Sequence, residues 1–158
     1  MQVDFETDIG GAEAVVLTPQ AVALDRLAPI KQALAPFVGK LIYLTAPYTN
    51  SPYGPEMAAE LATQIAAELM DEGINVFSPL THGSALLAKM ACAPTHAEWL
   101  AIDEPYRQAA CACIVAQLPG WQESAGVEYE RDWFGLHRKP VFLLTVEVAA
   151  KPPTANLA

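Results

Sequence analysis

Residues 119–130, PGWQESAGVEYE, hold side chains whose types and spacing suit chemistry. Gly126 and Glu130 are four residues apart, which places them on one face of a helix. Because Gly126 has no side chain, a substrate could approach the backbone there and lie against the Glu130 carboxylate. Ser124 occupies the N-cap position, where its hydroxyl serves either the helix or a ligand. The alternative is a solvated Glu130, with Ser124 only a cap and Gly126 only a turn residue.

The sequence around this segment predicts a strand, a loop and a helix. An apolar run at residues 111–118 is typical of a buried strand, and a helical pattern follows at 127–136. Ligands of open α/β sheets bind at the carboxyl ends of strands, where a helix start also offers free N–H groups. Two further loops follow strands, so the candidate binding residues at this edge are Tyr43, Ala46, Pro47, Tyr48, His82, Gly120, Ser124 and Gly126. Tyr43 belongs to the core instead unless it lies at the carboxyl end of its strand.

Apolar runs alternate with helical patterns along the chain. Continuous apolar runs suit strands that are covered on both faces. We expect strands at residues 41–46, 74–78, 111–118 and 140–145, and helices at 56–72, at 95–110 and after Ser124. Thr95 and Glu98 match a capping box, whereas Pro105 leaves open two helical pieces in that segment. Residues 79–94 are expected to form a turn containing His82 and Gly83, followed by a short apolar piece.

This alternation predicts an α/β fold with right-handed crossovers. We expect a three-layer Rossmann-like or flavodoxin-like parallel sheet with helices on both faces, plus an N-terminal helical extension at residues 1–39. The extension contains a possible strand at 14–17 and a helical pattern at 19–37, which Pro29 should kink or split. Its apolar residues would pack on the core or on a partner subunit: Leu24, Leu27, Ile30, Leu34 and Phe37. The α/β domain spans residues 40–148, and the tail at 149–158 looks loosely ordered.

The overall composition narrows the class of partner. The chain has 158 residues, of which 53% are hydrophobic, and a net charge of −9. This hydrophobic content suits one folded domain, and the negative charge argues against binding of polymeric nucleic acid. No apolar run reaches about 18 residues and the N-terminus lacks a signal-peptide pattern. We therefore expect a cytoplasmic protein without a membrane partner.

The cysteine and histidine residues give no sign of a metal centre. The three cysteines are interpreted as buried small hydrophobes rather than as metal ligands: Cys92, Cys111 and Cys113. The three histidines lack the spacing of a metal site: His82, His96 and His137. The sequence therefore predicts neither a metal nor another cofactor.

Three short motifs occur in an order that is similar to a known family. The first strand ends in Tyr-Leu-x-x-Pro-Tyr at residues 43–48, Asp103 lies on a middle helix, and Ser-x-Gly-Val-x-Tyr-Glu follows at 124–130. Together they resemble the nucleoside 2-deoxyribosyltransferase superfamily, including its DUF1937-type branch. The resemblance runs from about Lys40 to about Thr145 and leaves the N-terminal extension and the tail outside it.

The resemblance implies roles for individual residues. Glu130 matches the helix-borne Glu that attacks the anomeric carbon of the sugar. Asp103 is the best match to the Asp that assists this nucleophile and the departing base, with Glu104 or Glu98 as alternatives. Tyr43 or Tyr48 matches the aromatic residue that shapes the base and sugar pocket.

Ser124 departs from the transferase pattern. The transferases have an Asp at this position, which binds a sugar hydroxyl. A Ser here resembles the branch that hydrolyses deoxynucleoside 5′-monophosphates, because a hydroxyl at a helix start can donate to a phosphate that an Asp would repel. The departure favours a monophosphate substrate, whereas a simple helix cap remains the alternative.

The resulting expectation is cleavage of the N-glycosidic bond of a (deoxy)nucleoside or its 5′-monophosphate, by hydrolysis or base transfer. Two carboxylates, Glu130 and Asp103, would carry the reaction. The alternative is a non-catalytic nucleotide sensor on the same fold. The resemblance also implies a homo-oligomer.

Overall fold

The computed structural model describes residues 27–148. The possible strand at 14–17, Leu24, the earlier part of the helical pattern and the tail at 149–158 lie outside this range. The elements follow in the order α1 (Ala28–Leu34), η3 (Ala35–Phe37), β1 (Leu41–Thr45), α2 (Pro55–Asp71), β2 (Asn75–Phe77), α3 (Pro79–Leu87), α4 (His96–Ala109), β3 (Ala112–Gln117), α5 (Ala125–Leu136) and β4 (Val141–Thr145).

The four strands form one parallel sheet in the order β2-β1-β3-β4. The chain adds β2 on one side of β1 and then returns to add β3 and β4 on the other side. This is the flavodoxin-like order, in which the reversal between β1 and β3 opens a crevice at the carboxyl ends of the strands. The predicted α/β fold with a parallel sheet is thereby confirmed.

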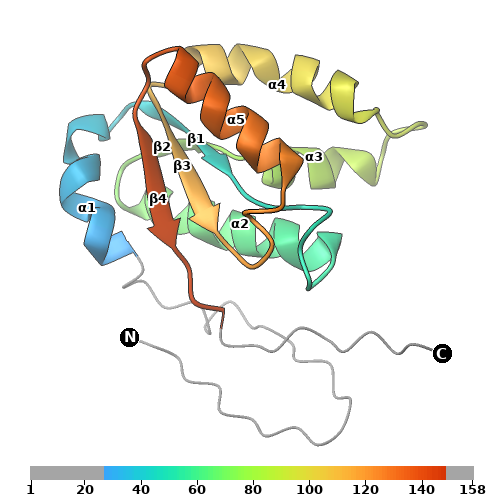
Figure 1. The fold of residues 1–158 in the computed structure, drawn as a ribbon, viewed down its shortest axis with the longest axis horizontal. Coiled ribbons are helices and arrows are strands. Elements are labelled where there is room, and N and C mark those ends of the chain that lie inside the picture. Colours follow the sequence, from blue (N-terminus) through green and yellow to red (C-terminus); the bar gives the residue numbers. More distant parts are fainter. Residues whose placement is uncertain (1–26, 149–158) are drawn as a thin grey trace, which may run out of the picture.

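Alternating side chains of β1 divide the interior into two cores. Ile42 and Leu44 belong to the larger core, which includes apolar residues of α1 and α2. Tyr43 belongs to a second core with Phe77 and Phe134, on the face that α5 covers. Helices therefore lie on both faces of the sheet, as Figure 1 shows. Because residues two apart point to the same face, this second face is also the one that Thr45 reaches.

The described part of the N-terminal extension packs on the α/β body. Leu27 and Leu34 are buried in the larger core, and the rings of Phe37 and Phe142 meet edge to face with centroids 5.6 Å apart. Pro29 lies in the first turn of α1, where it does not kink the helix. A proline is tolerated at this place because the first backbone N–H groups of a helix have no intrahelical acceptor.

In the middle of the chain, one expectation was wrong and one alternative that the sequence left open is resolved. Residues 79–87 form the helix α3 instead of a turn, since the Ser78 side chain accepts a hydrogen bond from the Thr81 N–H and Pro79 begins the helix. Helix α4 continues through Pro105 as one piece. Pro105 and Ala101 are both exposed, so the carbonyl that loses its helical donor at Ala101 lies on the solvent side.

The cysteines are less buried than expected. Cys113 is buried on β3, but Cys92 and Cys111 are exposed. Cys111 precedes the first residue of β3, and Cys92 lies in the connection between α3 and α4. The prediction of three buried cysteines therefore extended the apolar strand one residue too far and ignored the loop.

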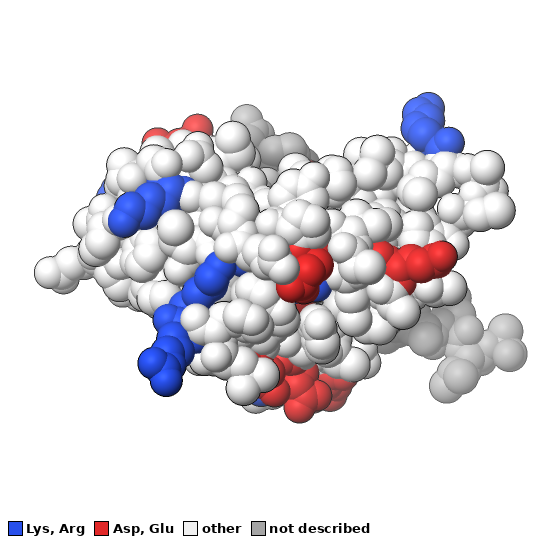
Figure 2. All heavy atoms as spheres, turned by 90° about the horizontal axis from the view of Figure 1, so that it is seen from above, with Lys and Arg blue, Asp and Glu red and all other residues white. Residues whose placement is uncertain are grey.

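Few charged side chains lie on the face seen from above, on the side of α4 and α5. Figure 2 shows that most of this surface is uncharged, with Lys and Arg standing among scattered Asp and Glu. Most acidic and basic groups in this view therefore sit singly, and the negative net charge of the chain is not concentrated in one broad patch here.

Gly120 brings the loop after β3 against the loop after β1. Its φ is +89°, and a Cβ built on it would lie 2.1 Å from the backbone oxygen of Asn50. Only glycine allows both this backbone conformation and this approach. The contact therefore fixes the spacing of the two loops that follow the central strands.

Gly120→Ala is expected to lower the free energy of unfolding by about 3 kcal/mol or more, because left-handed strain and a backbone clash add. Gly39→Ala is the matched control, since Gly39 has a φ of +76° but open space around its Cβ position. The control should lose only about 1 kcal/mol, the cost of the strain alone. Urea denaturation of both variants measures the difference. Equal losses of unfolding free energy would show that the loop at Asn50 moves aside at little cost.

Candidate active site

A cavity of about 170 Å³ opens beside the carboxyl end of β1, at the reversal of strand order. A cavity of this size holds several water molecules or a small organic ligand. Its walls come from the loop after β1 and from α3, α4 and α5. Six of the residues predicted for the site line it: Ala46, Tyr48, Asp103, Ser124, Gly126 and Glu130.

Glu130 places a buried carboxylate at the cavity. The residue is 7% exposed and lies in the second turn of α5. Its Oε1 accepts a hydrogen bond of 2.6 Å from the Tyr43 hydroxyl, and its Oε2 accepts one from the Thr45 hydroxyl. Burial raises the pKa of Glu130 to about 7, although the two hydroxyls and the charge of Arg107 oppose this rise. The carboxyl is thus poised between its acid and its base form near neutral pH.

Asp103 faces the same cavity from α4. It is 4% exposed, and its Oδ1 has no hydrogen-bond partner among the described residues. Burial raises its pKa, while the charges of Arg107 and His82 lower it. Its own negative charge contributes to the raised pKa of Glu130, so the two carboxyls are electrostatically coupled. A coupled pair of this kind favours one protonated and one ionised member.

Tyr43 lies behind Glu130 and does not line the cavity. It is fully buried, and its ring packs between those of Phe77 and Phe134 at centroid distances of 5.6 and 5.5 Å. Burial and the neighbouring Glu130 raise the pKa of Tyr43 far above its usual value, so the hydroxyl keeps its proton. The structure places Tyr43 as a fixed hydrogen-bond donor to Glu130 rather than as a wall of the pocket.

Ser124 and Gly126 form the start of α5 at the cavity edge. The Ser124 Oγ accepts a hydrogen bond of 3.4 Å from the Val127 N–H, which makes Ser124 the N-cap of α5. A Cβ on Gly126 would meet only the Ser124 Oγ, at 3.9 Å. The backbone at Gly126 is therefore open to a ligand.

The other predicted binding residues lie away from the cavity wall. Pro47 is buried, and Gly120 contacts the loop at Asn50. The His82 ring packs near the rings of Phe77 and Tyr106, with a buried Nδ1 that has no hydrogen-bond partner in the described chain. His82 is close enough to influence the pKa of Asp103, so it belongs to the surroundings of the site.

Sequence reasoning missed three residues. Thr45 is two residues from Tyr43, and this spacing alone places both hydroxyls on one face of the strand. Trp99 lines the cavity four residues before Asp103, and the buried Arg107 follows four residues after it. The spacing of four predicts a single stripe on α4, so all three residues had a signal in the sequence.

The described residues hold no cluster of three His, Cys, Asp or Glu side chains arranged for a metal ion. Between residues 27 and 148, none of the helices has the length and apolar character needed to cross a bilayer. The side chains that line the cavity include two carboxyls, several hydroxyls, aromatic rings and the imidazole of His96.

The raised pKa of Glu130 predicts a pH dependence of stability. The folded protein keeps the Glu130 proton up to about pH 7, whereas the unfolded chain releases it near 4.5, so stability falls as pH rises through this window. Glu130→Gln should remove about 3 kcal/mol of this fall, with Asp103 unchanged in both proteins. Urea denaturation at a series of pH values checks this, and an unchanged pH dependence in the variant would contradict it.

Comparison with known proteins agrees with the motif order at the site. The profile of the domain of unknown function DUF1937 matches residues 40–146, which include all four strands and both carboxyls of the cavity. No curated protein matches the sequence. The chain is therefore a member of the DUF1937 family.

Proposed function

We propose that this protein cleaves the N-glycosidic bond of a (deoxy)nucleoside or its 5′-monophosphate, with Glu130 as the nucleophile. One observation carries the proposal: a buried carboxylate, held by two hydroxyls of β1, lines a cavity together with a second buried carboxyl. Most enzymes that cleave glycosides through a covalent intermediate use such a pair. The resemblance to the nucleoside 2-deoxyribosyltransferases supplies the substrate class.

The proposed reaction has two steps. An oxygen of ionised Glu130 bonds to the anomeric carbon while the bond to the base nitrogen breaks, and the electron pair leaves with the base. Asp103 in its protonated form donates a proton to the departing base. A water molecule then attacks the anomeric carbon and gives a proton to the Asp103 carboxylate, while the bond to Glu130 breaks. This step releases the sugar and regenerates both the Glu130 carboxylate and protonated Asp103. In the transfer reaction a second base takes the place of the water.

The hydrogen bonds of the two carboxyls support this division of roles. Tyr43 and Thr45 donate to Glu130 and stabilise its ionised form, whereas Asp103 Oδ1 receives no such hydrogen bond. The environments of two titratable groups often distinguish an acid from a base in this way. Trp99 on the cavity wall provides an aromatic surface for the base. The expected homo-oligomer and the cytoplasmic location remain part of the proposal.

Glu130→Gln is expected to lower base release by about a thousandfold or more, since the amide cannot form the covalent intermediate. The assay measures free base by chromatography from deoxynucleosides and from their 5′-monophosphates. Glu128→Gln is the matched control, because Glu128 is exposed on the same helix and should retain full activity. Adding a second free base and looking for a new nucleoside distinguishes transfer from hydrolysis.

Loss of activity in both variants would point to disturbed folding, and full activity in Glu130→Gln would overturn the assignment. A nucleotide sensor predicts a third pattern: no base release by the wild-type protein, with a ligand-induced rise in melting temperature that survives in Glu130→Gln.

Trp99→Ala is expected to raise KM about tenfold or more with a smaller effect on kcat, because stacking on an aromatic ring contributes about 1–3 kcal/mol per base. Trp99→Phe retains an aromatic ring and should recover most of the affinity. Steady-state kinetics of both variants measure this, and a change in kcat alone would show that Trp99 does not hold the base.

A further inference from the structure

Arg107 is the largest fully buried side chain in the described part of the chain. It extends from α4 and has 0% of its surface exposed. An arginine keeps its charge at all pH values that a protein tolerates. Burial of such a charge is costly unless its hydrogen bonds and its charge are compensated. The groups that accept its hydrogen bonds and balance its charge therefore indicate the role of Arg107.

The partners of Arg107 on its own helix account for one nitrogen. Nη2 donates to the Glu104 Oε2 at 2.8 Å and to the Leu100 carbonyl. Nε and Nη1 have no hydrogen-bond partner among the described residues. The Glu104 side chain is 34% exposed, so an ion pair with it alone does not require a fully buried guanidinium.

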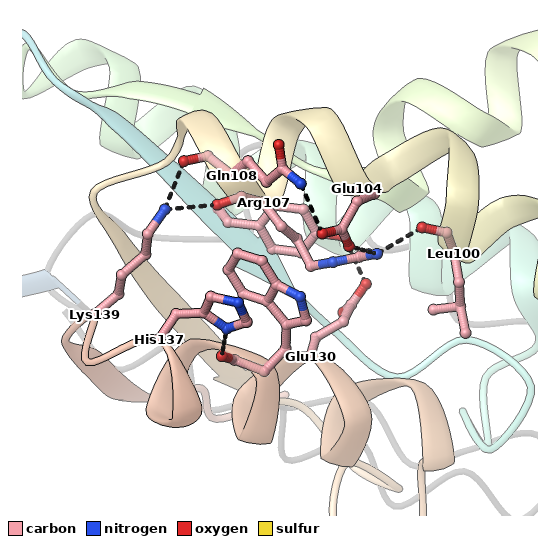
Figure 3. A network of polar contacts seen from close by, with 9 residues as sticks. Leu100, Glu104, Arg107, Gln108, Glu130, His137 and Lys139 are labelled. Carbon is pink, nitrogen blue, oxygen red and sulfur yellow. Dashed lines mark hydrogen bonds and ion pairs between the residues drawn. The ribbon is translucent and has the colours of Figure 1, made fainter.

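The rest of the guanidinium faces the nucleophile. Its charge acts on Tyr43 of β1 and on Glu130 of α5, the two groups joined by the 2.6 Å hydrogen bond. Figure 3 shows Arg107 and Glu130 reaching toward each other from facing helices. The rings of Tyr129 and Trp133 lie 5.4 and 5.9 Å from the guanidinium carbon and hold it from the α5 side.

A lysine fixes the backbone that carries Arg107. Lys139 Nζ donates to the carbonyls of Arg107, Gln108 and Ala110 at 3.0, 2.6 and 2.6 Å, at the end of α4. Figure 3 shows the first two of these bonds. These carbonyls lack helical donors, so a cation satisfies them and opposes the helix dipole. The last turn of α4, and with it Arg107, is thereby anchored to the segment between α5 and β4.

We propose that Arg107 is a positioning residue, whose buried positive charge behind Glu130 favours the ionised form of the Glu130 carboxylate. The inference rests on the proposed function, in which Glu130 reacts as a carboxylate. No Lys or Arg is among the cavity-lining residues, so in the described chain this charge acts from behind Glu130 and not on the ligand.

Several titratable groups surround this pair. The pKa of Glu130 is influenced by Tyr43 of β1 and by Asp103 and Arg107 of α4. The charge of Glu130 in turn raises the pKa of Cys113 of β3, in addition to the larger effect of burial. His82 of α3 acts on Asp103, and His137 acts on Glu104. Burial is the main influence that opposes ionisation of Glu130, and the negative charge of Asp103 acts in the same direction. Arg107 is the permanent positive charge against them.

The test titrates the Glu130 carboxyl directly. Protein labelled with ¹³C at the Glu side-chain carboxyls is followed by NMR from pH 4 to 9, and the Glu130 signal is assigned by its absence in Glu130→Gln. In Arg107→Met the midpoint of Glu130 should rise by about one to three pH units. The acid limb of kcat/KM should move to higher pH by the same amount, and Arg107→Lys should restore most of the original position.

Glu104→Gln is the control for a purely structural ion pair. It removes the partner of Arg107 but leaves the guanidinium charge, so the Glu130 midpoint should not rise. A structural role predicts instead that Arg107→Met and Glu104→Gln both lower stability and leave the midpoint in place. That result would overturn the proposal, as would a rise in Glu104→Gln as large as the one in Arg107→Met.

A second variant and a readout that is independent of activity complete the test. Arg107→Gln retains a donor for the Leu100 carbonyl and replaces Arg107→Met if the latter does not fold; the same rise is expected. The NMR titration requires no turnover. A shifted midpoint without base release by the wild-type protein would refute the glycosidase function alone, whereas base release with an unshifted midpoint would refute the role of Arg107 alone.

Discussion

The burial of the Glu130 carboxyl is the constraint on which the rest of the site depends. An ionised carboxylate removed from water requires hydrogen-bond donors, and β1 supplies two of them through Tyr43 and Thr45. The Tyr43 ring is in turn fixed by the aromatic rings of Phe77 and Phe134. The second core of the protein therefore fixes the position of the Tyr43 hydroxyl. On this face of the sheet, the contacts that pack the Tyr43 ring also place its hydroxyl at Glu130.

The strand alternation of β1 makes this double use of the sheet possible. Ile42 and Leu44 point into the larger core, where they pack the sheet against α2. Of the cavity-lining residues, Ala46 belongs to this core and Leu80 packs against it. Tyr43 and Thr45 point to the other face. The flavodoxin-like strand order adds the crevice at the carboxyl ends of the strands. The loop after β1 and the start of α5 line this crevice. Stability is thus supplied mainly on one face and chemistry on the other.

Local patterns in the sequence were sufficient for the parallel sheet, for the cap at Ser124 and for the exposure of Gly126 and Glu130 to one site. These local patterns were insufficient where a contact with a residue distant in the chain determines the structure. Gly83 suggested a turn, but it lies in α3 where a Cβ would sit 3.4 Å from the Trp99 ring, so its small size serves helix packing. Likewise a tyrosine inside an apolar strand reads as core, and only the fold shows that its hydroxyl meets Glu130, 87 positions later.

The arrangement of charge around the cavity is consistent with the proposed chemistry. In the proposed reaction, cleavage of an N-glycosidic bond builds positive charge on the sugar, which the ionised Glu130 carboxylate would stabilise. A cation lining the cavity would oppose that charge, and among the described residues the wall has neither Lys nor Arg. Arg107 lies instead behind the nucleophile, where its charge favours ionised Glu130 without facing the sugar. The stripe on α4 thus places Trp99 and Asp103 at the cavity wall and the buried Arg107 one turn further on, the arrangement that the proposed reaction would use.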